Sequence, residues 1–466
     1  MSGLFSSLNA SVKALSAQSR ALETTGKNLA NVNNATYSRQ RVIFGDRGTV
    51  ETPEGAESLG LEALGIQQLR DVLLDKQVIR EIALTASTTA EQQTYQRTQA
   101  SLGQTVGSTS GANGSAGGLG GAIDDFFNAF QSFASRPTDD GEKQTLLQKS
   151  AILSDRFNQT DSRLAQVQSD INSQIASDVT EANRLLAAIA DLNKQIGRIE
   201  IGRPGTAIDL RDQRQAQLEA LAAKIPVESR VANDGMINVV MKDASNADVI
   251  LVNGPNTTGT VAFTGTTFTG GASATVLAFS SGSVSGYLNA RDGAVQTLRD
   301  QLDTLAAQMV TAVNAAYNPT SAVGFNFFDP AGLTAGTIEM DAALTSSSIR
   351  AGTGAAGENA LALAVAAIAS QVFSTGTGGL INGTIAKVYT GAASDLGQAL
   401  STVNTRLDDQ TGLDKLVRTQ RDSVSGVSLD EEMAELVRYQ RAFQASSRVF
   451  NIIDDLLDVV VNRLGN

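Results

Sequence analysis

Apolar residues recur every seven positions near both ends of the chain, as they do along one face of a coiled-coil helix. This row of apolar residues is found between residues 8 and 29 and again after residue 428. Its members are Leu8, Leu15, Leu22, Leu29, Leu429, Leu436, Phe443, Phe450, Leu457 and Leu464, and Met433 holds the companion heptad position. The pattern predicts a long helix at each end, and we expect the two helices to pair as a coiled-coil base for assembly.

The middle of the chain changes between helical and β-like patterns. Residues 142–201 hold apolar side chains at two heptad positions, which predicts a long coiled-coil-like helix. Phenylalanines at helical spacing between residues 126 and 133 indicate core packing. Residues 227–283 change to short alternating runs rich in Val, Thr and Gly, which are typical of a small β-rich insert.

The other segments are predicted from weaker patterns. Residues 45–60 are rich in Gly and Glu and are expected to form a loop, and residues 61–102 are expected to form a helix. A Gly-rich flexible connection is predicted at 103–121. Residues 318–358 show no regular period, and three further helical segments are expected after them.

These elements predict a mainly α protein with a β insert, an α+β multidomain chain. Residues 1–44 and 420–466 would form the terminal coiled-coil domain that assembles. Residues 45–225 and 284–419 would form a helical bundle in the middle, and residues 226–283 a small β-rich outer domain.

Composition narrows the classes of function. The chain has 466 residues, a net charge of −12, and no Cys, His or Trp. The missing Cys and His exclude disulfides, zinc fingers, thiol nucleophiles and serine triads, and the acidic balance opposes nucleic-acid binding. The longest apolar run, residues 360–369, is about half the length of a bilayer span, so no membrane insertion is expected. The N-terminus has neither the basic nor the apolar region of a cleaved secretory signal.

One glycine motif and two acidic pairs are the candidates for chemistry. Gly352, Gly354 and Gly357 match G-x-G-x-x-G, but neither a buried strand before them nor a well-placed acidic residue after them is found. A loop ahead of a helix is the favoured interpretation. The pairs at 408–409 and 454–455 lack the ligand spacing of a calcium loop. No catalytic residue, cofactor or metal site is therefore predicted, and we expect no enzyme.

The heptad residues of the two terminal helices are expected to need packing partners from other chains. Burying six such side chains contributes roughly 9–18 kcal/mol. Ordering about 38 residues costs about 1 kcal/mol or more for each in backbone entropy. The pattern therefore favours a narrow contact that is repeated among many subunits. An ordinary helix pair within one chain is the alternative interpretation.

Two segments resemble the signatures of the axial proteins of the bacterial flagellum. Residues 28–40, NLANVNNATYSRQ, resemble the N-terminal signature of rod, hook and hook-associated subunits. Residues 423–445, SVSGVSLDEEMAELVRYQRAFQA, resemble the C-terminal signature in the form found in hook-associated members. Further similar segments lie at 126–137, 209–214, 285–292 and 357–363. The signature residues are Asn31, Asn33, Tyr37, Ser38, Arg39, Gln40, Ser425, Gly426, Leu429, Asp430, Glu431, Glu432, Tyr439 and Gln440.

The resemblance implies a structural subunit that forms the junction between hook and filament. Such a subunit would associate with itself in a ring through its N- and C-terminal helices. Hook subunits would lie on one side, and a second hook-associated protein or the filament on the other. It would reach the extracellular flagellum by the flagellar type III route, with a dedicated export chaperone at its C-terminal helix. No cofactor is implied.

The chain departs from the family pattern at two turns. Asn34-Ala35-Thr36 replaces the Thr-Pro-Gly turn of the signature, so Asn33 or Asn34 is expected to supply any left-handed turn residue. Tyr317 and Asn318 stand where the family pattern has a His and a Gly. Two alternatives stay open: another flagellar axial subunit (hook, rod or flagellin-like), and a coiled-coil surface adhesin.

Overall fold

The structure, a computed structural model, describes residues 2–46, 48–52, 55–58, 60–102, 118–233, 235–354 and 357–462. The chain forms two compact units. The terminal unit comprises Met1–Thr85, Val179–Gly282 and Gln410–Asn466, and the central unit comprises Ala86–Asp178 and Ser283–Asp409. The three-part division expected from the sequence stays a prediction. Most of the Gly-rich connection at 103–121 and the seam residue Leu464 lie outside the described residues.

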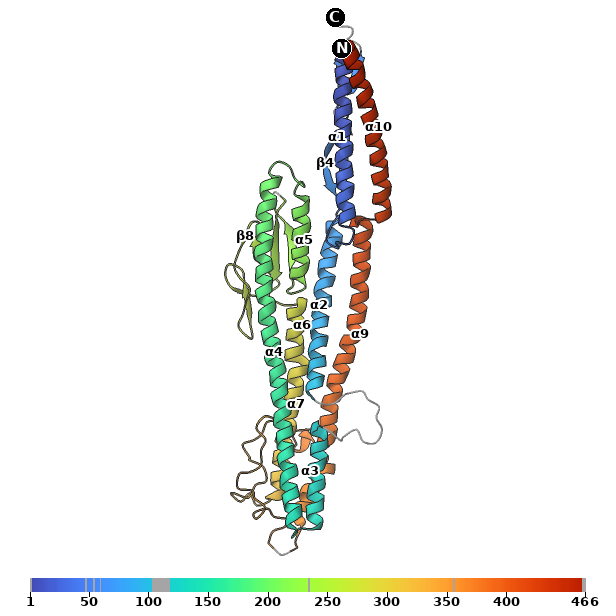
Figure 1. Ribbon diagram of the computed structural model, residues 1–466. Coiled ribbons are helices and arrows are strands. Elements are labelled where there is room, and N and C mark those ends of the chain that lie inside the picture. The colour runs from blue at the N-terminus through green and yellow to red at the C-terminus, as the bar shows by residue number, and fades with distance from the viewer. Residues whose placement is uncertain are drawn as a thin grey trace. The chain divides into compact units, whose positions relative to one another are not determined.

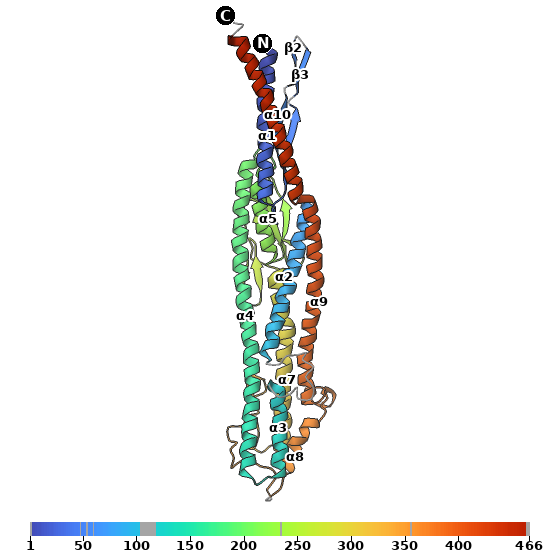
Figure 2. The same cartoon turned by 45° about the vertical axis from the view of Figure 1, so that its right-hand side comes forward.

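The two ends of the chain form a helix pair within the terminal unit. α1 (Ser2–Ala30) and α10 (Leu429–Asn462) lie side by side in both views (Figures 1 and 2). Ala21 of α1 packs with Val42 and with Tyr439 of α10 in one small buried cluster. The predicted terminal helices are confirmed, and they pair inside a single chain.

Strands lie between Gln40 and Gln68, and from residue 45 on the sequence predicts a loop and the start of a helix instead. The first and last of these strands pair antiparallel, from Gln40 opposite Gln68 to Asp46 opposite Leu61. The other two form a hairpin between them. The strands are β1 (Gln40–Asp46), β2 (Thr49–Thr52), β3 (Gly55–Ser58) and β4 (Leu61–Gln68).

The helix predicted from Leu61 is wrong over its first eleven residues. The segment LEALGIQQ has helix-forming residues, but pairing with β1 supplies its backbone with hydrogen-bond partners and overrides propensity. α2 (Val72–Ser101) begins only after Asp71, whose carboxylate accepts hydrogen bonds from the backbone N–H groups of Leu73 (2.8 Å) and Leu74 (3.2 Å). This cap fixes where the helix starts.

The β-rich insert is present and packs on helices of the same unit. Its larger sheet has the strand order β5-β6-β7-β8 and its smaller sheet β11-β10-β9. Asn193 and Asn183 of α4 hold backbone groups of the insert: the Asn193 amide donates to the carbonyls of Ile237 (2.8 Å) and Gly254 (2.7 Å), and Asn183 exchanges two hydrogen bonds with Val261. The elements are α4 (Asp140–Glu200), α5 (Ile208–Ala222), β5 (Glu228–Val231), β6 (Ile237–Lys242), β7 (Asp248–Asn253), β8 (Asn256–Thr257), β9 (Ala262–Phe263), β10 (Phe268–Gly270) and β11 (Thr275–Val276).

Aromatic side chains form the centre of the core of the central unit. Phe126 and Phe130 of α3 are fully buried against Phe327 and Phe328, with ring centroids 5.0–5.8 Å apart between the two pairs. The predicted core role of the phenylalanines is confirmed. The helices contributing to this unit are parts of α2 and α4, α3 (Gly118–Ser135), α6 (Gly282–Ala290), a π-helical turn (Arg291–Val295), α7 (Gln296–Tyr317), α8 (Ala360–Ala367), the 3-10 turns Ile368–Ser370 and Thr375–Thr377, and the part of α9 (Ile385–Ser425) up to Asp409.

The irregular segment after α7 is organised by side-chain amides. The Asn314 carboxamide oxygen accepts hydrogen bonds from the backbone N–H groups of Phe327 and Phe328, each 2.9 Å long. Asn318 ends α7 with a φ of −128° and holds the carbonyl of Ala322 with its amide. An asparagine can therefore stand where the family has a glycine, because no left-handed backbone is needed there.

Replacing Phe130 with Ala should destabilise the central unit by about 3–5 kcal/mol, because the vacated volume lies among rings that cannot close over it. The unfolding transition, followed by circular dichroism in guanidinium chloride, measures this loss. Phe325→Ala is the matched control, since Phe325 is 46% exposed and its removal leaves no internal cavity. Equal losses for both variants would contradict this core assignment.

Candidate assembly site

A buried side-chain amide lies between the N-terminal signature and the start of α10. Asn28, in the last turns of α1, is 1% exposed. Its oxygen accepts hydrogen bonds from the Tyr37 hydroxyl (2.8 Å) and the Gln40 N–H (3.0 Å). Its amino group donates to the Gln40 carbonyl (2.8 Å) and to a carboxylate oxygen of Glu432 (3.0 Å). All four hydrogen-bonding positions of this amide are used.

Arg39 binds the same carboxylate from the other side. Its Nε lies 2.7 Å from Glu432, which is 1% exposed, and its Nη1 lies 2.6 Å from Glu431. Burial opposes the charge of Arg39, but Glu432 and Glu431 outweigh it and raise the pKa of the guanidinium. The Arg39 N–H also donates to the carbonyl of Ser425 (2.8 Å). We call Asn28, Arg39, Gln40 and Glu432 the polar clasp, because they join the N-terminal segment to α10.

A second charged cluster lies next to the clasp. Arg70 donates to the Ser38 hydroxyl (3.1 Å) and lies 3.1 Å from Asp212 and 3.3 Å from Asp75. Arg421, near the end of α9, pairs with Glu219 of α5 (2.8 Å) and donates to the carbonyl of Ala35 (2.8 Å) in the signature turn; Arg421 and Glu219 are both buried. The cluster therefore binds the turn between α1 and β1 to α5 and α9.

Burial and neighbouring charges shift the pKa values of two acids that face this cluster. Burial raises the pKa of Asp212 to about 7, because it outweighs the opposing effect of Arg70. Burial also raises the pKa of the Tyr37 hydroxyl, and the carboxylates of Asp212, Asp209 and Glu432 add to this shift. Clasp and cluster together bury four carboxylates, on Asp75, Asp212, Glu219 and Glu432, beside the guanidinium groups of Arg39, Arg70 and Arg421.

The corner between α9 and α10 requires a residue without a side chain. Gly426 donates its N–H to the carbonyl of Asp422 (2.8 Å), and a Cβ at this position would lie 2.4 Å from that same oxygen. The signature glycine is thus explained by a close backbone approach. In the other signature turn, the Asn34 side chain accepts from the Thr36 N–H (3.3 Å). Neither Asn33 nor Asn34 has a positive φ, so the expected left-handed residue is absent from this turn.

Two family descriptions match separate parts of the chain. Residues 108–328 match the flagellar hook-associated protein FlgK helical domain, and residues 418–464 match the flagellar basal body rod FlgEFG protein C-terminal family. The chain is 25% identical to flagellar hook-associated protein 1 of Bacillus subtilis (strain 168), over 100% of this chain and 99% of the relative. It is 24% identical to the protein of the same name from Salmonella typhimurium, over 98% and 99%.

Along nearly its whole length the chain resembles the flagellar hook-associated proteins. The chain is therefore similar to structural proteins of the flagellum and not to enzymes. A solved structure described as the flagellar hook junction protein FlgK from Burkholderia pseudomallei is 20% identical, covers 55% of this chain and 46% of that one, and has a TM-score of 0.46.

The G-x-G-x-x-G motif forms a loop that binds its own chain. The backbone N–H groups of Thr353 (2.9 Å) and Gly354 (3.1 Å) donate to the carboxylate of Glu358, ahead of α8. In the described part of the chain, no helix is long and apolar enough to cross a membrane. Among those same residues, no group of three or more acidic side chains could hold a metal ion.

The signature residues of the chain fall into two groups. Tyr37, Ser38, Arg39, Gln40, Ser425, Gly426 and Glu432 are buried or half-buried around the clasp. Glu431 is exposed but pairs with Arg39, and Tyr439 packs against Phe44 with ring centroids 6.2 Å apart. The remaining residues lie on the surface or near it: Asn31, Asn33, Leu429, Asp430 and Gln440.

The heptad residues do not form one buried row within the chain. Leu8, Leu15, Leu22 and Leu29 are half-buried, and the most buried residues of α1 are Ala17, Ala21, Thr24, Thr25 and Asn28. On α10, Leu429, Met433 and Phe443 are exposed, Leu436 and Phe450 are half-buried, and Leu457 is buried. A straight helix turns about 20° per heptad away from a seven-residue repeat. The row therefore rotates toward α1 along its length.

Sequence reasoning missed the partners of the signature. Asn28, Arg70, Asp212, Glu219 and Arg421 had no predicted role. The similar segment at 209–214 was a usable signal, because it contains Asp212. Nothing in the spacing of residues 28, 212 and 421 indicates that they meet.

Asn28→Ala should destabilise the terminal unit by about 3 kcal/mol or more, because it leaves several buried groups without partners. The Gln40 N–H and carbonyl and one oxygen of Glu432 would each lose a hydrogen bond. Thermal unfolding of the full chain measures the effect. Asn33→Ala, in the exposed part of the same turn, is the control and should change little. A neutral Asn28→Ala variant would contradict the clasp.

Stability should fall as pH rises from 5 to 8. The pKa of Asp212 is about 7 in the folded chain and near 3.8 when unfolded, so between these values only the folded state keeps the proton. Unfolding free energy then decreases by up to about 1.4 kcal/mol per pH unit. The chain has no His, which leaves this pH range almost free of other side-chain titrations. Asp212→Asn should flatten the curve of melting temperature against pH, and an unchanged slope would refute the assignment.

Proposed function

We propose that this chain is the subunit that joins the hook to the filament, and that its copies assemble through the outer face of the terminal helix pair. The observation that carries this proposal is an exposed apolar stripe on α10, which we call the terminal ridge. Its residues are between 39% and 59% exposed. They are Leu429, Met433, Val437, Val449, Ile452, Leu456 and Val459.

The terminal ridge points away from the contacts that hold α10 to its own chain. The spacing of its first members is four residues, so they follow one another along a helical ridge that is interrupted at Arg441. Tyr439 and Leu457 occupy the opposite, buried side. An exposed apolar surface of this kind is expected to bind a partner. Burying the exposed half of seven such side chains would contribute roughly 5–10 kcal/mol per subunit.

The family resemblance supports the finer parts of the proposal. Copies would form a ring, with hook subunits on one side and a second hook-associated protein or the filament on the other. Export by the flagellar type III route would place the chain outside the cell. A chaperone would cover α10 before assembly, since an exposed apolar ridge promotes aggregation of the free chain.

The alternatives predict different phenotypes. A strain that lacks this protein should have complete hooks and no filaments attached to them. A hook or rod subunit would leave no complete hook when deleted, and an adhesin would leave flagella unchanged. Electron microscopy of the deletion strain, with and without the restored gene, distinguishes the junction subunit from a hook or rod subunit and from an adhesin.

Met433→Asp and Ile452→Asp should each abolish filament attachment without lowering the melting temperature of the soluble chain. Each substitution places a carboxylate in a contact that forms only between subunits, where an unpaired buried charge costs several kcal/mol. Asn451→Asp is the matched control, because it adds the same charge at an exposed polar position next to Ile452, and it should keep filaments. Tyr439→Asp, on the buried side, should unfold the helix pair in the free chain.

Filaments counted by microscopy and shed filament in the medium measure the first effect, and calorimetry measures the second. If the ridge variants also lost thermal stability, the ridge would pack within one chain. The proposed assembly surface would then be wrong.

A further inference from the structure

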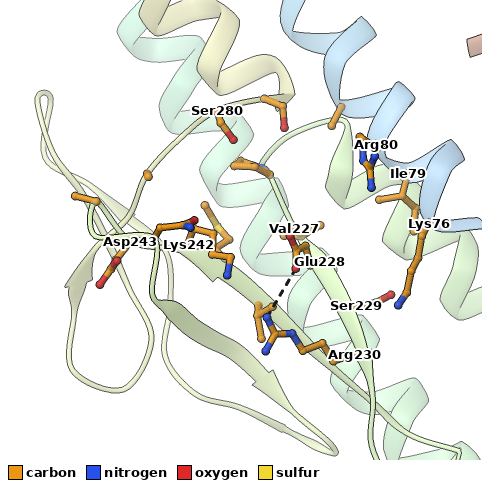
Figure 3. Close-up of a pocket in the computed structure, with 18 residues that line it drawn as sticks. Lys76, Ile79, Arg80, Val227, Glu228, Ser229, Arg230, Lys242, Asp243 and Ser280 are labelled. Carbon is orange, nitrogen blue, oxygen red and sulfur yellow. Dashed lines mark ion pairs between the residues drawn. The ribbon is translucent and has the colours of Figure 1, made fainter. Parts of the chain in front are cut away.

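A basic groove lies beside the β-rich insert in the terminal unit. It has a volume of about 670 Å³. Lys76 and Arg80 project into it from α2, and Arg230 and Lys242 approach it from the strands on the other side (Figure 3). The floor is apolar and buried, with Ile79, Ala83, Val227, Val240 and Met241. Glu228 and Asp243 line the groove as well, so it carries four cations and two acids, a positive excess in a chain of net charge −12.

The two cations of α2 are the ones available to a ligand. Lys242 lies 2.7 Å from Asp248, and Arg230 pairs with Asp248 as well and lies 3.9 Å from Glu228. In the described part of the chain, no salt bridge or hydrogen bond involves the side chain of Lys76 or of Arg80. The groove therefore offers an apolar floor and two uncompensated positive charges, which fits a helix that carries both apolar and acidic side chains.

α9 has a face of that kind on its outer side. Leu413 and Leu416 are 51% and 64% exposed and, at 100° per residue, lie within about 60° of Asp409 around the helix. Asp408 and Asp409 are exposed, and no ion pair of either is found among the described residues. We call Asp409, Leu413 and Leu416 the acidic ridge, and Asp408 lies on a neighbouring side of the helix, about 100° away from Asp409. The acidic pair at 454–455 is a weaker candidate, because it lies on the helix that carries the terminal ridge.

We propose that the basic groove of one subunit receives the acidic ridge of a second copy of this chain. The inference rests on the proposed assembly of copies and names a second contact between them. The opposed charges would offset the repulsion between two chains that are each strongly acidic.

The positions of groove and ridge imply a head-to-tail contact. On α2, the groove residues 76, 79, 80 and 83 cover about 100° of the helix, whereas Glu81, which accepts a hydrogen bond from Gln410 of α9, lies about 150° from their centre. The groove and α9 therefore lie on opposite sides of α2. A two-fold dimer uses the same surface of both subunits. The basic groove and the acidic ridge lie on different sides of the chain, so one such surface cannot contain both of them. Such a contact closes into a ring or continues as a helix.

Cysteine cross-linking tests this contact directly, because the chain has no Cys of its own. Arg80→Cys and Asp409→Cys chains are expressed together in a strain lacking the native gene, and isolated flagella are treated with a short bis-maleimide. We expect a cross-linked dimer only when both variants are present, since the reagent spans the space of the two long side chains, which is too wide for a direct disulfide. Each variant expressed alone is the control and should give monomer only.

A charge exchange tests the same pair without a covalent bond. Arg80→Asp and Asp409→Arg should each lower the amount of this protein in isolated flagella at least about tenfold. The double variant should restore it, because the two charges are opposed again in the reversed sense.

The outcomes separate this inference from the proposed function. One outcome is that the chain is present in flagella, but no mixed dimer forms and the double charge variant is not restored. This outcome would overturn the groove contact and leave the junction role intact. A cross-link from Arg80→Cys to a different protein would assign the groove to another occupant and also overturn it. Absence of the wild-type chain from isolated flagella would overturn both proposals.

Discussion

The amide of Asn28 joins three segments that are far apart in the sequence. It lies at the end of α1, holds both backbone groups of Gln40, and reaches the carboxylate of Glu432 at the start of α10. Water cannot replace these hydrogen bonds in the folded chain, because Asn28 and Glu432 are each only 1% exposed. An unpaired carboxylate in that position would be strongly destabilising. The hydrogen bonds therefore fix the register of the two terminal helices at one end and leave their other ends to pack by apolar contact.

This arrangement explains how one helix can serve two surfaces. The clasp and Tyr439 hold one side of α10 against its own chain, so the terminal ridge on the other side stays available to a partner. The heptad row rotates around a straight helix. A residue of this row on α10 therefore faces either its own chain or the outer surface, according to its place along the helix. The basic groove and the acidic ridge would add a charged contact to this apolar one. Apolar burial would supply most of the affinity, and the charges would select the orientation.

The parts of the fold that were predictable from the sequence are those with long, regular periods. The terminal helices, the helix at 140–200 and the aromatic core around Phe126 follow directly from apolar spacing. The strand at 61–68 did not, because its residues favour a helix and only pairing with β1 makes it a strand. The signature located three of the four clasp residues, Arg39, Gln40 and Glu432. The fourth, Asn28, is one polar residue in a helix, and in the neighbouring charged cluster Asp212 and Arg421 come from helices that no local pattern connects.

Hydrogen exchange in the isolated full chain tests the clasp most directly. The backbone N–H groups of Arg39 and Gln40 donate to Ser425 and Asn28, and that of Leu69 donates to Arg39. These three amides should exchange slowly and together in the free monomer, as one cooperative unit, and Asn28→Ala should accelerate all three. Exchange at the rate of an unfolded chain, while the amides of the central unit stay protected, would show that the termini are not joined before assembly and would contradict the account.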